Sequence, residues 1–167
     1  NSFLHLFFKY FEKINYLQAD KIGVMSESNL KIFSTRSDFN KFEVLSSWQK
    51  PVKAEANIEL LKEYGLTHLI NKTVFFYGGN IGIAQGIDVL LDLSKSLIYD
   101  KNIHFVFIGK GDCIELLKDK SLINVTYLES LKPESYYSLV SNFDVGLFSL
   151  HSNHTAHNYP GKIWGYM

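Results

Sequence analysis

Beyond residue 72 the sequence alternates short runs rich in Val, Ile and Phe with stretches of helical periodicity. The runs predict strands over residues 73–77, 104–108, 124–128 and 144–148. The stretches between them predict helices over residues 86–97, 113–118 and 133–141, the last with Tyr136 on its surface and Tyr137 in the core. Apolar strands separated by helices pair in parallel through right-handed crossovers. The fold class that this pattern predicts is therefore α/β, a parallel sheet with helices on its faces.

The segment before residue 51 carries a weaker version of the same pattern. Residues 3–17 have apolar side chains at spacings of three and four, which predicts an amphipathic helix packed on a core. Strands are expected over residues 21–25 and 42–45, and Ser26 is expected to cap a helix over residues 27–33. Pro51 then marks a break, and a weakly helical stretch follows until Gly65. We interpret this stretch as part of a linker.

The composition is that of a globular chain, and it argues against several classes of protein. The 17 Lys and Arg residues balance the 17 Asp and Glu residues, whereas nucleic-acid binding rests on clustered cations. Cys113 is the single cysteine, so an internal disulfide is impossible and a reducing compartment is expected. No apolar run approaches the roughly 20 residues that a membrane-spanning helix needs. We therefore expect neither a nucleic-acid partner nor a disulfide-stabilised secreted scaffold.

Three loops follow expected strands, at the edge of a parallel sheet where ligands bind. The first, residues 78–86, is rich in glycine and opens a helix, which fits either a phosphate site or a structural turn. The second, residues 109–112, contains Lys110 and fits either an anion contact or a plain turn. The third runs from His151 through His154 and His157 to Lys162. Its histidines lack the further ligands that zinc sites use, so we expect them to donate hydrogen bonds to a ligand.

Several short motifs occur in a fixed order along nearly the whole chain. They are Ala19-Asp20, Val44-Leu45 before Trp48, Phe76-Tyr77-Gly78-Gly79-Asn80-Ile81-Gly82, Gln85-Gly86, Ile108-Gly109-Lys110-Gly111, Phe143-Asp144-Val145-Gly146-Leu147 and Pro160-Gly161-Lys162-Ile163. In these motifs the sequence resembles the family-four glycosyltransferases of the GT-B fold. It looks most like the bacterial subgroup that builds capsule, O-antigen and related surface polysaccharides, where a Gly-Asn-Ile-Gly loop is followed by Gln-Gly.

The resemblance implies that the chain contains parts of two domains. Residues 1–50 would be the end of an N-terminal, acceptor-side domain, and residues 51–71 the interdomain linker. Residues 72–167 would be a C-terminal, Rossmann-like donor-binding domain that is cut short. The chain begins at Asn1 rather than Met and ends at Met167 inside an expected helix, so we expect a fragment at both ends. Such a fragment is expected to be inactive alone.

The resemblance also implies the substrates and the residues that bind them. A hexose or N-acetylhexosamine would pass from a nucleotide-diphosphate donor, a UDP-sugar, to a lipid-linked or oligosaccharide acceptor. The anomeric configuration would be retained, and neither a metal nor another cofactor would be needed. The implied ligands of the diphosphate are Gly79, Asn80, Gly82, Gln85, Gly161 and Lys162, those of the nucleoside are Gly109, Lys110, Gly111, Asp112, Leu128 and Glu129, and those of the sugar are His154, His157 and Asn158. The reaction would be cytoplasmic, and the N-terminal domain would supply any peripheral contact with the inner face of the plasma membrane.

The sequence departs from the family pattern at its charged positions. The wider family carries arginine at the position of Asn80 and lysine at that of Gln85, and its two glutamates fall on His157 and Gly165. We expect Lys162 and backbone amides to compensate, because charge-assisted hydrogen bonds to phosphate are strong. Negative charge develops on the departing diphosphate, and Lys162 and His157 are therefore the expected catalytic residues.

Two other functions fit an α/β sheet. One is a non-catalytic nucleotide- or ligand-binding module, such as a flavodoxin-like or receiver-type domain. A receiver needs clustered aspartates after its strands, and the expected strand ends lack an acidic pair. A GT-B epimerase acting on UDP-sugars shares the fold but needs carboxylates in its cleft, which the missing glutamates do not supply. Nucleotide-sugar titration separates the binding module from the transferase, and product analysis separates the epimerase.

Overall fold

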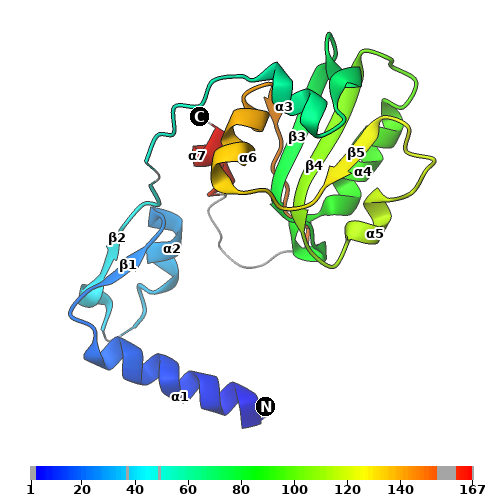
Figure 1. Ribbon diagram of the computed structural model, residues 1–167. Helices are drawn as coiled ribbons and strands as arrows, with labels where there is room; N and C mark the ends of the chain where they lie inside the picture. The colour runs from blue at the N-terminus through cyan, green and yellow to red at the C-terminus, as the bar shows by residue number, and fades with distance from the viewer. Residues whose placement is uncertain (1–2, 37, 49, 154–160, 167) are drawn as a thin grey trace. The chain divides into compact units, whose positions relative to one another are not determined.

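The computed structural model describes residues 3–36, 38–48, 50–153 and 161–166 (Figure 1). Contacts divide the chain into two compact units, one formed by residues before 49 and the other by residues 49–155 and 160–167. The smaller unit contains α1 (Phe3–Gln18), β1 (Ile22–Val24), α2 (Glu27–Ile32), the 3-10 turn η1 (Phe39–Lys41) and β2 (Phe42–Val44). Its two strands pair in parallel, with Ile22 opposite Phe42.

Local chemistry explains most of the smaller unit. The Ser26 side chain accepts a hydrogen bond from the amide of Asn29, so Ser26 caps α2 as expected. Phe33 stacks on the buried Phe42 with the ring centres 4.6 Å apart. The expectation that the first helix packs on a core is wrong for the described structure, because α1 buries none of its residues there. Phe7 and Phe11 contact each other along the helix, and Tyr16 near its end meets the buried Phe42 edge-on, with the ring centres 5.6 Å apart.

The larger unit is the α/β sheet that the sequence predicts. Its elements are α3 (Ile58–Glu63), the 3-10 turn η2 (Thr67–Leu69), β3 (Thr73–Asn80), the 3-10 turn η3 (Ile83–Gln85), α4 (Ile87–Ser96), β4 (Ile103–Lys110), α5 (Ile114–Leu117), β5 (Val125–Leu128), α6 (Pro133–Val140), β6 (Val145–Gly146) and α7 (Lys162–Tyr166). The strands lie in the order β5-β4-β3-β6, and all of them pair in parallel. The prediction of parallel pairing is confirmed.

Both faces of this sheet are covered, which is why its strands are apolar at successive positions. Side chains of a strand alternate between the two faces, so Phe105 and Phe107 of β4 share one core with α4 and α5. Val106 and Ile108 lie in the other core, together with α3 and α6 (Figure 1). Leu61, Leu66 and Leu69, within the segment that the sequence suggests as a linker, are buried in this second core.

The strand ends differ from the sequence prediction in a way that matters for the site. β3 continues to Asn80 and β4 to Lys110, so the first residues of both expected glycine loops belong to the sheet. Gly79 lies opposite Gly109, and a Cβ on Gly109 would stand 1.8 Å from the carbonyl oxygen of Gly79. Glycine at this position, where φ is +156°, therefore lets the two backbones approach closely enough to pair.

The last strand is shorter than expected. β6 comprises only Val145 and Gly146 instead of residues 144–148. After β6 the chain turns toward the 3-10 turn η3, where the amide of His151 donates to the carbonyl of Ala84 at 3.1 Å. The amide of Leu147 still donates to the carbonyl of Phe76 in β3 at 2.6 Å, and the chain leaves the sheet only after this residue, which keeps the strand short.

Candidate functional site

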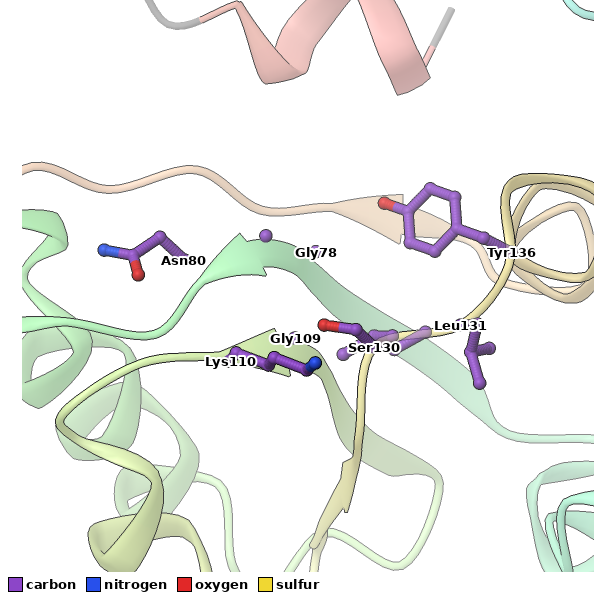
Figure 2. A pocket seen from close by; sticks show the side chains of 9 residues that line it. Gly78, Asn80, Gly109, Lys110, Ser130, Leu131 and Tyr136 are labelled. Carbon is purple, nitrogen blue, oxygen red and sulfur yellow. The ribbon is translucent and has the colours of Figure 1, made fainter.

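A cavity of about 390 Å³ opens at the carboxyl ends of β3 and β4, where ligands bind in parallel sheets (Figure 2). Its walls come from the last residues of both strands, from the loop after β5 and from the first turns of α6. The lining residues are Gly78, Gly79, Asn80, Ile108, Gly109, Lys110, Ser130, Leu131 and Tyr136. The fold thus brings two expected groups, Gly79 with Asn80 and Gly109 with Lys110, to one cavity.

Tyr136 forms one wall of this cavity. Figure 2 shows its hydroxyl reaching from α6 toward the end of β3, and a Cβ on Gly78 would lie 2.1 Å from that oxygen. The glycine at position 78 therefore makes room for the phenol. Burial raises the pKa of Tyr136, so the hydroxyl stays protonated and can donate a hydrogen bond to a ligand. The expectation that Tyr136 lies on the helix surface is wrong, and Tyr137 is half-buried rather than in the core.

Lys110 supplies a positive charge to the cavity. It is the last residue of β4, and its side chain runs toward the loop that carries Ser130 (Figure 2). Within the described part of the chain Lys110 forms no ion pair, so its ammonium group has no carboxylate to neutralise it. The other residues expected at the nucleoside, which are Gly111, Asp112, Leu128 and Glu129, do not line the cavity.

Asn80 and Gln85 bind each other. The amide nitrogen of the Asn80 side chain donates to Oε1 of Gln85 at 2.6 Å, and the side chain points away from Gly78 and Tyr136 (Figure 2). Both side chains and that of Asp112 crowd Gly82, where a Cβ would lie within 2.9 Å of each. In this structure the two neutral side chains expected at the diphosphate therefore satisfy each other.

Some backbone amides of the glycine-rich segment already form hydrogen bonds within the protein. The amide of Ile81 donates to the carbonyl of Lys110 at 2.7 Å, and the amide of Gly78 donates to the Tyr166 hydroxyl at 3.3 Å. The amides that remain for a ligand are therefore fewer than the glycine content of this loop suggests.

Lys162 is brought to the same strand end from a distant part of the sequence. It is the first residue of α7, and a Cβ on Gly79 would lie 2.9 Å from its Cε and 3.4 Å from its Nζ. The ammonium group donates to the Tyr77 hydroxyl and lies 3.6 Å from the centre of the Tyr77 ring. Burial lowers the pKa of Lys162 to about 8. Of its expected neighbours, Gly161 is exposed, whereas His154, His157 and Asn158 lie outside the described residues.

Several residues of the site were missed by reasoning from the sequence. One is Tyr77, which directly precedes Gly78 and Gly79. Another is Tyr166, whose hydroxyl accepts a hydrogen bond from the amide of Gly78 and donates one to the carbonyl of Leu147 at 3.0 Å. Ser130 and Leu131 lie two and three residues beyond β5 and complete the wall next to Tyr136. A sequence signal existed for Tyr77, which directly precedes the glycines, and for Tyr136, which follows the helix-opening Pro133 by three residues.

No group of three or more His, Cys, Asp or Glu side chains is arranged to hold a metal ion in the described part of the chain. None of the helices in the described ranges is both long and apolar enough to cross a membrane.

Comparison with known proteins identifies the fold. No protein family and no curated protein sequence matches the chain. Among solved structures, a TarM variant from S. aureus, in complex with Fondaparinux, alpha-GlcNAc-glycerol and UDP, is 15% identical with a TM-score of 0.60 over 82% of this chain. HepE from Anabaena, in complex with UDP and glucose, is 12% identical with a TM-score of 0.58 over 78% of this chain.

These similarities establish the architecture. The α/β fold, with parallel strands flanked by helices, is the Rossmann-like arrangement of GT-B glycosyltransferases, as the sequence predicts. The matched part covers 27% of the TarM chain and 38% of the HepE chain, so this chain spans well under half the length of either protein.

Proposed function

We propose that this chain belongs to a retaining glycosyltransferase and that its larger unit binds the nucleotide-diphosphate sugar, a UDP-sugar. In this proposal residues 72–167 form the donor-binding domain, and residues 1–50 form the end of the acceptor-side domain. Residues 51–71 form the connection, whose Leu61, Leu66 and Leu69 pack into a core of the donor-binding domain. The transferred group is a hexose or N-acetylhexosamine, and the acceptor is a lipid-linked or other saccharide of a bacterial surface polysaccharide, such as capsule or O-antigen. The reaction takes place in the cytoplasm or at the inner face of the plasma membrane.

The observation that carries the proposal is the position of Lys162 beside Gly79, which is one of the residues that line the cavity at the ends of β3 and β4. An ammonium group next to bare backbone at the carboxyl end of a parallel sheet suits a phosphate. The fold adds support, because TarM and HepE were both crystallised with UDP. Lys110 places an ammonium group at the cavity itself, where the neutral Asn80 and Gln85 provide none.

The geometry suggests what each group does during transfer. Breaking the bond between the sugar and the diphosphate leaves negative charge on the β-phosphate, and a fixed positive group there lowers the barrier. Lys162 is that group in our proposal. The base of the nucleotide lies toward the walls formed by Gly109, Ser130 and Tyr136. The roles of His157 as a catalytic group and of His154 and Asn158 at the sugar stay proposals from the resemblance.

The proposal is tested by titrating the 167-residue chain with UDP, GDP and ADP in a calorimeter. We expect UDP to bind more tightly than the other two nucleotides. Lys162→Ala is expected to weaken UDP binding roughly tenfold or more, because a hydrogen bond to a charged group is lost. The matched control is Lys101→Ala, an exposed lysine just before β4, which is expected to leave the affinity unchanged.

The possible outcomes separate the two parts of the proposal. If none of the nucleotides binds to the wild-type chain, the donor site is wrong. If UDP binds equally well to wild type and to Lys162→Ala, the donor site stands and the role of Lys162 is wrong.

A further inference from the structure

Tyr77 touches Lys162 in two ways. The ammonium group lies 3.6 Å from the centre of the phenol ring, within the range of a cation–π interaction, and it also donates a hydrogen bond to the hydroxyl. Tyr77 is completely buried in the core that β3 shares with α4 and α5, so its ring has little freedom to move. Lys162 therefore rests on a rigid surface, although its own helix is short.

The hydroxyl of Tyr77 is oriented by a second hydrogen bond. It donates to the carbonyl oxygen of Asn80 at 2.7 Å, three residues further along the strand. A phenol has one proton to donate, so its lone pairs face the ammonium group of Lys162. The hydrogen bonds thus run in one direction, from Lys162 to Tyr77 to the backbone of Asn80. This arrangement fixes the ammonium group next to Gly79.

We propose that Tyr77 is a positioning residue, which holds the ammonium group of Lys162 at the diphosphate site before the donor arrives. The inference rests on the proposed function, because it assigns Tyr77 a part in the same donor site. An ammonium group has three protons. One of them is given to Tyr77, which leaves two for the oxygens of a diphosphate. Ordering the lysine beforehand reduces the conformational entropy that would otherwise be lost on binding.

The charge state of Lys162 depends on the same contact. Burial lowers its pKa to about 8, whereas an oxygen that accepts from the ammonium group favours the charged form. Among the described residues, this ammonium group contacts Tyr77 on β3, Tyr166 lies one turn further along α7 and influences Tyr77, and no carboxylate pairs with the ammonium group. Burial raises the pKa of both tyrosines, so both are neutral when Lys162 titrates.

The experiment compares Tyr77→Phe with the wild-type chain. Phenylalanine keeps the buried ring and removes only the hydroxyl, so folding is preserved. We expect UDP to bind roughly three- to tenfold more weakly, the cost of ordering one lysine side chain. Between pH 7 and 9, the UDP affinity of Tyr77→Phe should begin to fall at a lower pH than that of wild type. Without the hydroxyl as acceptor, the ammonium group of Lys162 loses its proton more readily. In the background of Lys162→Ala, Tyr77→Phe should have no effect on UDP binding, since its partner is gone.

A second measurement needs no nucleotide. The rate at which acetic anhydride labels Lys162, followed by mass spectrometry over the same pH range, reports the titration of its amine. Tyr77→Phe is expected to shift that titration to lower pH and to increase the rate. An unchanged titration and rate would overturn the positioning role. It would also be overturned if Tyr77→Phe weakened UDP binding equally in the wild-type chain and in Lys162→Ala. If the labelling shifts but UDP binds to neither protein, the contact is real and the donor site is wrong.

Discussion

His104 is a buried histidine at the amino end of β4, the end opposite the candidate site. It is 3% exposed, and its Nε2 lies 2.9 Å from the hydroxyl of Thr126. Its Nδ1 has no hydrogen-bond partner within the described chain, and the ring of His68 stands edge-on with the ring centres 5.0 Å apart. Burial, with smaller effects from His68 and Lys72, lowers the pKa of His104 to about 4. The folded chain therefore holds this imidazole neutral.

Stability is consequently expected to depend on pH through His104. The unfolded chain takes up a proton near pH 6.5, but the folded chain takes it up only near pH 4, so acid favours unfolding. Between pH 8 and pH 5 this residue is expected to cost about 2 kcal/mol of unfolding free energy. Urea unfolding at both pH values checks this against His104→Leu, which cannot titrate. An equal loss of stability in both proteins would contradict the prediction.

At the level of elements, the edge strand β6 depends on a side chain as well as on its backbone. Asp144 directly precedes the strand, and its carboxylate accepts a hydrogen bond from the amide of Val74 at 2.7 Å. The amide of Asp144 donates to the carbonyl of Val74, and that of Leu147 donates to Phe76. Because β6 pairs with β3 over only two residues, these flanking bonds fix its position. The strand in turn supports Tyr166, whose ring lies over Gly146.

Asp144→Ala is expected to lower the unfolding free energy of the larger unit by about 1–3 kcal/mol, because it leaves the buried amide of Val74 without an acceptor. Asp144→Asn keeps an oxygen that can accept the hydrogen bond from the Val74 amide, so its unfolding free energy should fall clearly less. Thermal unfolding of both variants, followed by circular dichroism, measures the difference. Equal losses would show that the charge matters, and not the acceptor.

For the molecule as a whole, the division into two compact units predicts how ligand binding stabilises it. The residues that line the candidate site and Lys162 all belong to the larger unit. A ligand that binds only the folded larger unit stabilises that unit by mass action.

Hydrogen exchange followed by mass spectrometry checks this. With UDP at a hundredfold excess over its Kd, the exchange rate of those β3 and β4 amides that exchange through unfolding should fall about 100-fold. Amides of β1 and β2 should exchange as before. Equal protection of both units would show that they unfold together, and ADP at the same concentration is the control for unspecific effects.

The sequence was sufficient for the class of fold and for part of the site. Alternating apolar strands and helices predict the parallel sheet, because that pattern depends on local periodicity. Glycines after a strand predict that Gly79 and Gly109 lie at a ligand-binding edge, and both line the cavity. The extension of β3 to Asn80 was missed because strand propensity disfavours glycine, whereas pairing with the neighbouring backbone compensates for it.

The sequence by itself therefore determined the succession of strands and helices along the chain and the kinds of groups at the strand ends. Both are properties of neighbouring residues. Only the tertiary structure decided which of these groups meet. Asn80 binds Gln85, Tyr136 packs against Gly78, and Lys162 contacts Tyr77, which lies 85 residues away in the sequence. Such contacts join distant segments, and they are set by how helices pack on the sheet, which no local pattern encodes.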